Sequence, residues 1–454
     1  MIKLKLKRIV AGFIIINSFV FNSISQEIKE DEKPTINLSG YIKSDFIFDT
    51  RQTFSSREGH FLFWPLPVKN DVNDEDINAK PNFNFLALQS RLTLKVKGPD
   101  VFNAKSSGAV EGDFFGQAND NINLFRLRQA FVRLNWTNTE LLLGQYWNPM
   151  FVTKCYPEVL SFNTGVPFQP FAQNPQIRLT QKLGNINLLF AALSQRDYST
   201  KGPSGSGSEY LRNSAVPEFH FQVHFEDVNS ESGTGIYAGA GISYKTIVPR
   251  LYSEVTEVAG YDSASTITGK IVHISDVKSL YKVNEKLSSM SASGYIKYKA
   301  KSFTIKAEGV YGENSSDVLS IGGFAVKGIT DTITGEKDYT PLKNISFWCE
   351  IFTNGKKIQA GLFAGYTKNL GTKDEISGNS VYALAPNIES VYRIAPRIAF
   401  ISNKFKTVFE IEYTNAAFGS TNSSGLPVVN NYGEPENVTE VHNIRFITGV
   451  YYFF

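Results

Sequence analysis

The stretch Asn121–Pro149, NINLFRLRQAFVRLNWTNTELLLGQYWNP, predicts two long β-strands joined by a short turn. Side chains alternate in character along the first of them. One face carries Phe125, Leu127 and Phe131, and the other carries Arg126, Arg128 and Ala130. Arginine is costly inside a protein core, so this pattern places the apolar face outside and the charged face inside. That arrangement is typical of a transmembrane β-barrel strand.

The N-terminus has the features of an export signal. Four basic residues precede the apolar run Ile9–Phe21, which is followed by the small-residue pattern Ser23-Ile24-Ser25. The run is shorter than the ~20 residues of a spanning helix, so we expect a signal peptide over residues 1–25, cleaved before Gln26. Residues 26–34 then form a short periplasmic leader, and residues 35–454 form one barrel domain.

The composition supports export rather than nucleic-acid binding. The formal net charge is +3, but residues 1–25 hold four basic and no acidic residues, which leaves the mature chain near −1. The basic pI is therefore no sign of a nucleic-acid partner. The chain contains 35 Phe and 21 Tyr, and no second apolar run has the length of a spanning helix. These features predict a protein of a Gram-negative outer membrane, in contact with its lipid and lipopolysaccharide.

The same alternation recurs along the chain and predicts about 16 strands. They are Thr35–Phe48, Asn82–Lys97, Lys105–Phe115, Ile122–Trp136, Thr139–Trp147, Pro175–Leu183, Asn185–Gln195, Ala215–Asp227, Thr234–Val248, Met290–Ala300, Phe303–Glu313, Lys343–Thr353, Lys356–Lys368, Glu389–Ser402, Lys404–Phe418 and Glu440–Phe454. Short turns alternate with long polar loops between them. The fold class is therefore an all-β, antiparallel, up-and-down transmembrane barrel with short periplasmic turns and long extracellular loops.

The last strand has a lumenal and a lipid-facing side and ends on Phe454. An amphipathic C-terminal strand with a terminal Phe resembles the signal that the barrel-assembly machinery of Gram-negative bacteria recognises. We therefore expect that machinery to be a partner, recruited through Phe454.

The parity of each strand predicts which charged groups face the lumen. These are Arg91, Lys95, Arg126, Arg128, Arg178, Arg393, Arg397 and Arg445, with the acidic residues Glu111, Asp113 and Glu410. A guanidinium is always charged and binds carboxylate or phosphate in a fixed fork, so an arginine cluster favours anionic solutes. The alternative is that these arginines form salt bridges with the acidic residues and stiffen the wall.

The third outer loop, Asn148–Asn174, is the predicted constriction. It is unusually aromatic for a connection between strands, and such loops pack on something. It would fold into the pore, where Lys154, Tyr156, Glu158, Phe162 and Phe168 narrow the passage, or else pack against a neighbouring subunit.

A family resemblance rests on two segments of the opening hairpin. Phe125–Phe131 (FRLRQAF) and Leu143–Pro149 (LGQYWNP) resemble the "RLRxAY" and "GQxW" strands of DcaP-like porins, a branch of the trimeric Gram-negative porins. The resemblance implies a homotrimer that passes small anionic compounds. The chain departs from part of that family because no long coiled coil precedes the barrel.

The predicted function is passive diffusion of small hydrophilic solutes through an outer-membrane porin, with a bias toward anions from the lumenal arginines. One alternative is a carbohydrate-selective channel with Trp64, Trp147 and Tyr146 as a sliding track; another is a surface receptor or adhesin anchored by the barrel.

We expect no enzyme activity, cofactor or metal site. His220 and His224 lie four positions apart on one strand, roughly 13 Å, too far to share one ion.

Overall fold

The structure is a computed structural model that describes residues 33–116, 119–162, 164–258, 261–264, 271–274, 277–378 and 380–454. The signal peptide expected over residues 1–25, and most of the leader that follows it, lie outside the described residues. The first strand of the barrel starts at Thr35.

The described chain forms a closed antiparallel barrel of 16 strands, as the sequence predicts. Each strand pairs with the next barrel strand along the chain, and β1 pairs with β27 to close the ring. The barrel strands are β1 (Thr35–Asp49), β4 (Asn82–Leu86) continued by β5 (Arg91–Lys97), β6 (Lys105–Phe114), β7 (Phe125–Asn135), β8 (Thr139–Trp147), β9 (Gln173–Leu183), β10 (Ile186–Leu193), β13 (Glu218–Val228), β14 (Gly235–Ile247), β19 (Leu287–Lys299), β20 (Phe303–Glu313), β22 (Glu336–Thr353), β23 (Ile358–Thr372), β25 (Ile388–Ser402), β26 (Phe405–Phe418) and β27 (Thr439–Phe453).

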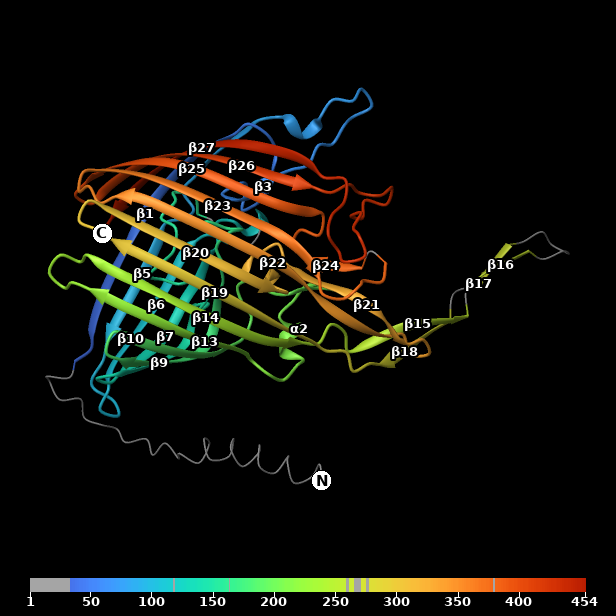
Figure 1. Cartoon of the computed structure of the whole chain (residues 1–454), viewed down its shortest axis with the longest axis horizontal. Helices are drawn as coiled ribbons and strands as arrows, with labels where there is room; N and C mark the ends of the chain where they lie inside the picture. Colours follow the sequence, from blue (N-terminus) through green and yellow to red (C-terminus); the bar gives the residue numbers. More distant parts are fainter. Residues whose placement is uncertain are drawn as a thin grey trace.

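Short turns gather at one end of the barrel and long connections at the other (Figure 1). The turns are tight, and Gly184 and Asn403 adopt left-handed backbone conformations in two of them. The long connections carry small elements of their own: β2 (Thr53–Ser56), β3 (Phe61–Pro65), β11 (Lys201–Gly202), β12 (Gly205–Ser206), α2 (Glu209–Arg212), β15 (Tyr252–Val258), β16 (Tyr261–Ala264), β17 (Ile271–Ile274), β18 (Val277–Lys282), β21 (Gly323–Asp331), β24 (Val381–Ala383) and the 3-10 helices η2 (Ile77–Ala79), η3 (Asn119–Asn121) and η4 (Ser316–Val318). Among the described residues, no helix is long and apolar enough to span a membrane.

The opening hairpin has the two faces that its sequence predicts, but only at its start. Phe125 and Leu127 are more than half exposed on the outer surface, while Arg128 is buried on the inner one. Beyond Arg128 the faces exchange. Val132 is exposed, and the ring of Phe131 packs 5.0 Å from that of Tyr146 on the inner side.

A β-bulge causes this exchange. Glu111 on β6 pairs with Gln129, but the next residue, Gly112, pairs with Leu127, so Arg128 is an extra residue on β7. One inserted residue moves every later side chain to the opposite face. The prediction that Phe131 shares the outer face of Phe125 is therefore wrong, as is the prediction that Ala130 shares the inner face of the arginines.

A similar irregularity divides the second predicted strand, Asn82–Lys97, into β4 and β5. Four residues, Ala87–Ser90, stand opposite three residues of β1. Strict alternation along Asn82–Lys97 predicts that Leu86 and Leu88 share the outer face of Leu92 and Leu94. That prediction is wrong, because Leu86 and Leu88 are buried, whereas Leu92 and Leu94 lie on the exposed outer face. The residues of β5 keep the faces that the sequence predicts, including an inner position for Arg91.

Candidate pore and constriction

The loop Asn148–Asn174 runs inside the barrel and contacts strands on the far side of the ring. The Lys306 ammonium on β20 donates a hydrogen bond to the Tyr156 carbonyl at 3.0 Å. The Leu160 backbone N–H donates to the Glu410 carboxylate on β26 at 2.8 Å. The Cys155 thiol donates to the Ile296 carbonyl on β19 at 3.3 Å. The loop therefore crosses the lumen instead of standing above it.

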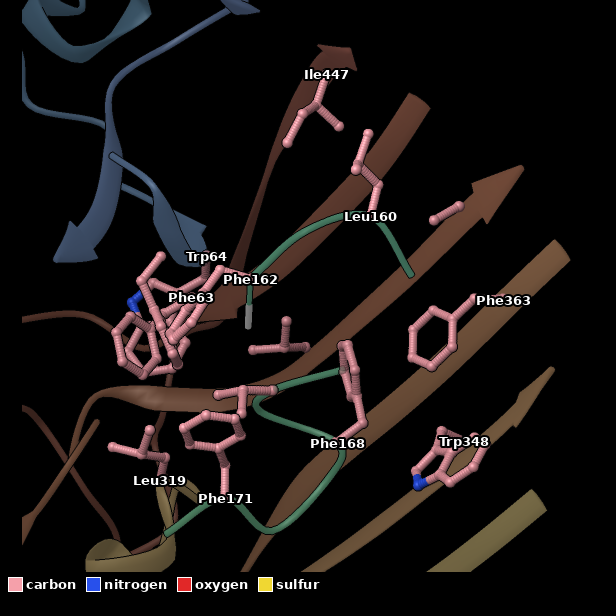
Figure 2. Packing of buried hydrophobic residues seen from close by; sticks show 14 of the residues in the cluster. Phe63, Trp64, Leu160, Phe162, Phe168, Phe171, Leu319, Trp348, Phe363 and Ile447 are labelled. Carbon is pink, nitrogen blue, oxygen red and sulfur yellow. The ribbon is translucent and has the colours of Figure 1, made fainter. Parts of the chain in front are cut away.

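Aromatic rings pack this loop in place. Trp147 at the end of β8 stacks on Phe151 with ring centroids 3.9 Å apart, and Phe151 lies 5.3 Å from Tyr156. Phe168 packs beside Phe363 of β23, with the ring centroids 6.1 Å apart (Figure 2). Burying each such ring stabilises the inward position by about 1.5–3 kcal/mol.

A second segment also enters the lumen, and the sequence reasoning missed it by treating residues 50–81 as a long polar loop. We call Thr53–Pro65, which contains β2 and β3, the first-loop hairpin. Residues 61–64 of this hairpin (FLFW) are at most 5% exposed. Phe61 packs 5.7 Å from Phe162 of the inward loop, and Figure 2 shows Phe63, Trp64 and Phe162 side by side. The run FLFWPLP at residues 61–67 was the available signal, because an exposed loop rarely carries so many large apolar side chains.

Polar contacts also hold the first-loop hairpin against the wall. His60 forms a 2.7 Å hydrogen bond with Asp45 of β1. Burial lowers the pKa of His60, although the hydrogen bond to the Asp45 carboxylate opposes that shift, so the imidazole is neutral at pH 7 and donates from Nε2. The guanidinium of Arg57 donates to the Gly116 carbonyl at 2.8 Å.

A cavity of about 430 Å³ lies between the inward loop and the strands β5–β8. Its lining combines charged and aromatic side chains: Arg91, Arg128, Lys406, Glu111, Glu158, Tyr146, Trp147, Tyr156 and Tyr451. Arg91, Arg128 and Glu111 were predicted from strand parity, and Glu158 was predicted from the constriction loop. Lys406 lines the cavity from β26 and was not predicted, although it lies four positions before Glu410 and parity places both on the same face.

We call the residues Arg91, Arg126, Arg128, Glu111 and Asp113, on β5–β7, the open wall. Arg128 binds Glu111 at 2.9 Å and Asp113 at 3.0 Å, and Arg126 binds Asp113 at 3.0 Å. Arg126 also reaches Asp197 at 3.3 Å. Arg91 stands farther from its partners, at 3.5 Å from Asp113 and 3.8 Å from Glu111, and it retains 18% of its exposure. The cations are thus paired, and Arg91 and Arg128 still border the cavity.

Lys406 differs from these arginines. Within the part of the chain that the structure describes, its ammonium forms no ion pair, and it lies 6.0 Å from the Tyr451 ring centroid. An ammonium outside any ion pair adds positive charge to the cavity, and the nearby carboxylates of Glu158 and Glu410 act on it only through space.

We call Arg393, Glu410, Glu412 and Arg445, on β25–β27, the covered wall. Arg445 forms a two-pronged pair with Asp49, at 2.7 and 2.9 Å, and is fully buried. Arg393 lies 3.8 Å from Glu412 and donates to backbone carbonyls of both inward segments. Parity predicts Arg393, Glu410 and Arg445 on the inner surface, and Glu412 shares the face of Glu410. The two inward segments cover all four side chains.

The other predicted site residues are spread around the lumen. Arg397 binds Glu350 at 2.6 Å, and Arg178 donates to Gln176 and to the Trp147 carbonyl. Lys95 is exposed on β5 and does not line the cavity. Lys154 is exposed and pairs with Glu226 at 2.5 Å.

Glu158 extends from the inward loop to Lys306 at 2.7 Å. Desolvation would raise the pKa of its carboxyl, but the Lys306 ammonium outweighs this effect and holds the pKa below its ordinary value. Glu158 is therefore a carboxylate at neutral pH. The loop is tied to β20 by an ion pair as well as by packing.

The structure also bears on the two other sites considered from the sequence, a sugar track of aromatic residues and a metal site at two histidines. Trp64 is 3% exposed and stacks on Phe54, so it does not offer a face to a sugar, whereas Trp147 and Tyr146 do line the cavity. His220 binds Glu218 and His224 binds Tyr237, so the two imidazoles have separate partners. Among the described residues, no group of three or more His, Cys, Asp or Glu side chains is arranged to hold a metal ion.

Comparisons with solved structures agree with the barrel. The chain resembles the crystal structure of the outer membrane channel DcaP of Acinetobacter baumannii, with a TM-score of 0.63 and 16% identity over 94% of this chain and 99% of that one. It also resembles in-vitro folded OmpT, an outer membrane protein of Vibrio cholerae, in its trimer form, with a TM-score of 0.51 and 10% identity over 93% of this chain and 100% of that one. No family model and no curated protein matches the sequence. At these identities the likeness establishes the fold: the chain has the 16-stranded barrel of outer-membrane channels.

Proposed function

We propose that this protein is an outer-membrane porin that lets small hydrophilic solutes diffuse passively. The observation that carries the proposal is the polar cavity between the inward loop and the open wall, within a closed barrel of 16 strands. A barrel that served only as an anchor has no need of a loop folded across its lumen. The fold shared with a solved outer-membrane channel supports the same function.

We further propose that the pore prefers anions. Three cations, Arg91, Arg128 and Lys406, border the cavity, together with two carboxylates, Glu111 and Glu158. Glu158 is neutralised by Lys306, which leaves a local excess of positive charge. Arginine and lysine side chains at a constriction lower the barrier for anions and raise it for cations.

Conductance of the purified full chain in planar bilayers tests the channel itself. We expect stepwise currents that open without a ligand, and the absence of steps would refute the porin function and favour an anchored receptor. A carbohydrate channel is the second candidate, because Trp147 and Tyr146 line the cavity. Block of the current by linear oligosaccharides but not by dicarboxylates would favour that candidate over the anion pore.

The proposed location is the outer membrane of a Gram-negative cell, where the exposed apolar side chains of the outer surface face lipid and lipopolysaccharide. A homotrimer is proposed on the resemblance of the sequence and on the trimer form of one similar structure.

Exposed Phe454 at the end of the chain is the proposed signal for the assembly machinery. Deleting Phe454 should lower the amount of folded, heat-modifiable protein in isolated outer membranes; an unchanged amount would refute that role.

A further inference from the structure

We propose that the first-loop hairpin, Thr53–Pro65, is a second constriction element that works beside the loop Asn148–Asn174. It fills the part of the lumen beside Arg393 of β25 and Arg445 of β27 and thereby confines solutes to a path between the open wall and Lys406 of β26. This inference rests on the proposed porin function, because only a conducting barrel has a path to confine.

A single guanidinium joins the hairpin, the inward loop and the barrel. Arg393 of β25 donates to the Phe63 carbonyl at 2.9 Å, to the Leu62 carbonyl at 3.4 Å and to the Val166 carbonyl at 3.0 Å. The side chain is 1% exposed. A charged donor buried this deeply must keep its acceptors, so the hairpin and the inward loop are held in position together.

Apolar packing makes this part of the lumen dry. The ring of Phe61 contacts Phe162 and Phe171 of the inward loop, at 5.7 and 5.9 Å, and Phe63 and Trp64 pack beside them. Hydrophilic solutes cannot cross a layer of packed rings without losing their hydration. The wet route therefore runs on the other side of the loop, where the charged cavity lies.

The hairpin also covers charges that would otherwise line the pore. The turn of the hairpin approaches β27: a Cβ added at Gly59 would lie 4.0 Å from the Arg445 guanidinium. Beside Arg445 lie Asp49 and Glu412, so this wall holds charges of both signs. Uncovering it would widen the pore without adding an excess of positive charge.

The test is excision of the hairpin from the full chain. Gln52 and Leu66 are already joined by a 2.9 Å backbone hydrogen bond, so Gly-Gly can replace Thr53–Pro65 and close the gap. A matched control replaces Asp71–Glu75, an exposed turn of the same loop between the bridged residues Asn70 and Asp76, with Gly-Gly. Single-channel conductance and the size of the largest neutral polyethylene glycol that enters the pore are measured for both.

We expect excision to raise the conductance on the order of twofold and to admit larger polymers, because pore diameter limits passage. The control should conduct like the unmodified chain. Where excision prevents assembly, the double variant Phe61→Ser, Phe63→Ser loosens the hairpin without removing it and should show an intermediate rise. If the unmodified protein conducts and the hairpin variant that assembles has the same conductance, the inference about the hairpin is wrong while the porin function stands. An unmodified protein without current would refute the porin function itself.

Discussion

The open wall and the covered wall carry the same kinds of side chain, arginines beside carboxylates, on two parts of one barrel that only β1 separates. They differ in what lies over them. Arg91 and Arg126 of the open wall retain 18% and 10% exposure, and Arg128, at 2%, still lines the cavity, whereas Arg393 and Arg445 of the covered wall retain 1% and 0%. The difference comes from the two inward segments, which pack on Arg393 and Arg445 and leave the cavity between β5–β8 and Lys406 of β26.

This difference assigns the two walls separate roles. Charges in contact with water act on passing solutes through an electrostatic field that dissolved salt weakens but does not remove. Charges removed from water act mainly on their own partners, and their loss leaves an uncompensated buried charge. We therefore expect the open wall to control selectivity and the covered wall to control stability.

The largest expected effect is on stability. Arg445→Ala leaves the Asp49 carboxylate buried without its partner, which should lower the free energy of unfolding by about 3–5 kcal/mol. Arg91→Ala is the matched control on the open wall, and its partly exposed pairs should be worth about 1 kcal/mol or less. Urea unfolding in detergent, followed by intrinsic fluorescence, measures both. Equal losses in the two variants would remove the distinction between the walls.

A smaller effect concerns the anchor of the inward loop. Lys306→Gln removes the donor to Tyr156 and the partner of Glu158, two charge-assisted contacts that together stabilise the loop by about 1.5–3 kcal/mol. The open-channel current should become noisier as the loop moves. Lys154→Gln, which breaks an exposed ion pair of the same loop, serves as the control and should leave the noise unchanged. If the current noise of the Lys306→Gln channel equals that of the unmodified protein, aromatic packing alone holds the loop in place.

The smallest energy change should appear in ion selectivity. Arg128→Gln leaves Glu111 and Asp113 with fewer cations and should shift the permeability ratio toward cations by about threefold, since a unit charge roughly 7 Å away in water is worth about 0.6 kcal/mol. Glu412→Gln removes a charge from the covered wall without removing a hydrogen bond to either inward segment, and it should leave the ratio unchanged. The reversal potential in a salt gradient reports both variants. A shift of similar size toward anions in Glu412→Gln would show that the covered wall also contacts the solute path.

Much of the fold follows from alternation along the strands, because the side-chain period of two directly separates lipid from lumen. Prediction of the faces by alternation fails where one extra residue enters a strand, as at Arg128 and at Ala87–Ser90. Such a bulge depends on the pairing with the neighbouring strand, which the alternation of a single strand does not show. Parity places Arg128 and Arg445 correctly on the inner surface. It does not separate their environments, since exposure there depends on loops that are distant in sequence.

The aromatic content of the loop Asn148–Asn174 is sufficient to predict that it packs on something. The same argument applies to FLFWPLP at residues 61–67, but that run is short and lies within a long segment, residues 50–81, that is otherwise largely polar. Its burial depends on Arg393, more than three hundred positions away, which no local pattern connects to it.

The central claim is that the open wall borders a conducting path and biases it toward anions. The most direct test is the reversal potential of the full chain in a tenfold potassium chloride gradient, compared with that of the triple variant Arg91→Gln, Arg128→Gln, Lys406→Gln. We predict stepwise currents with a reversal potential toward that of chloride, and a shift toward that of potassium in the variant. A reversal potential already on the potassium side, or one that the three substitutions leave unchanged, would contradict the account.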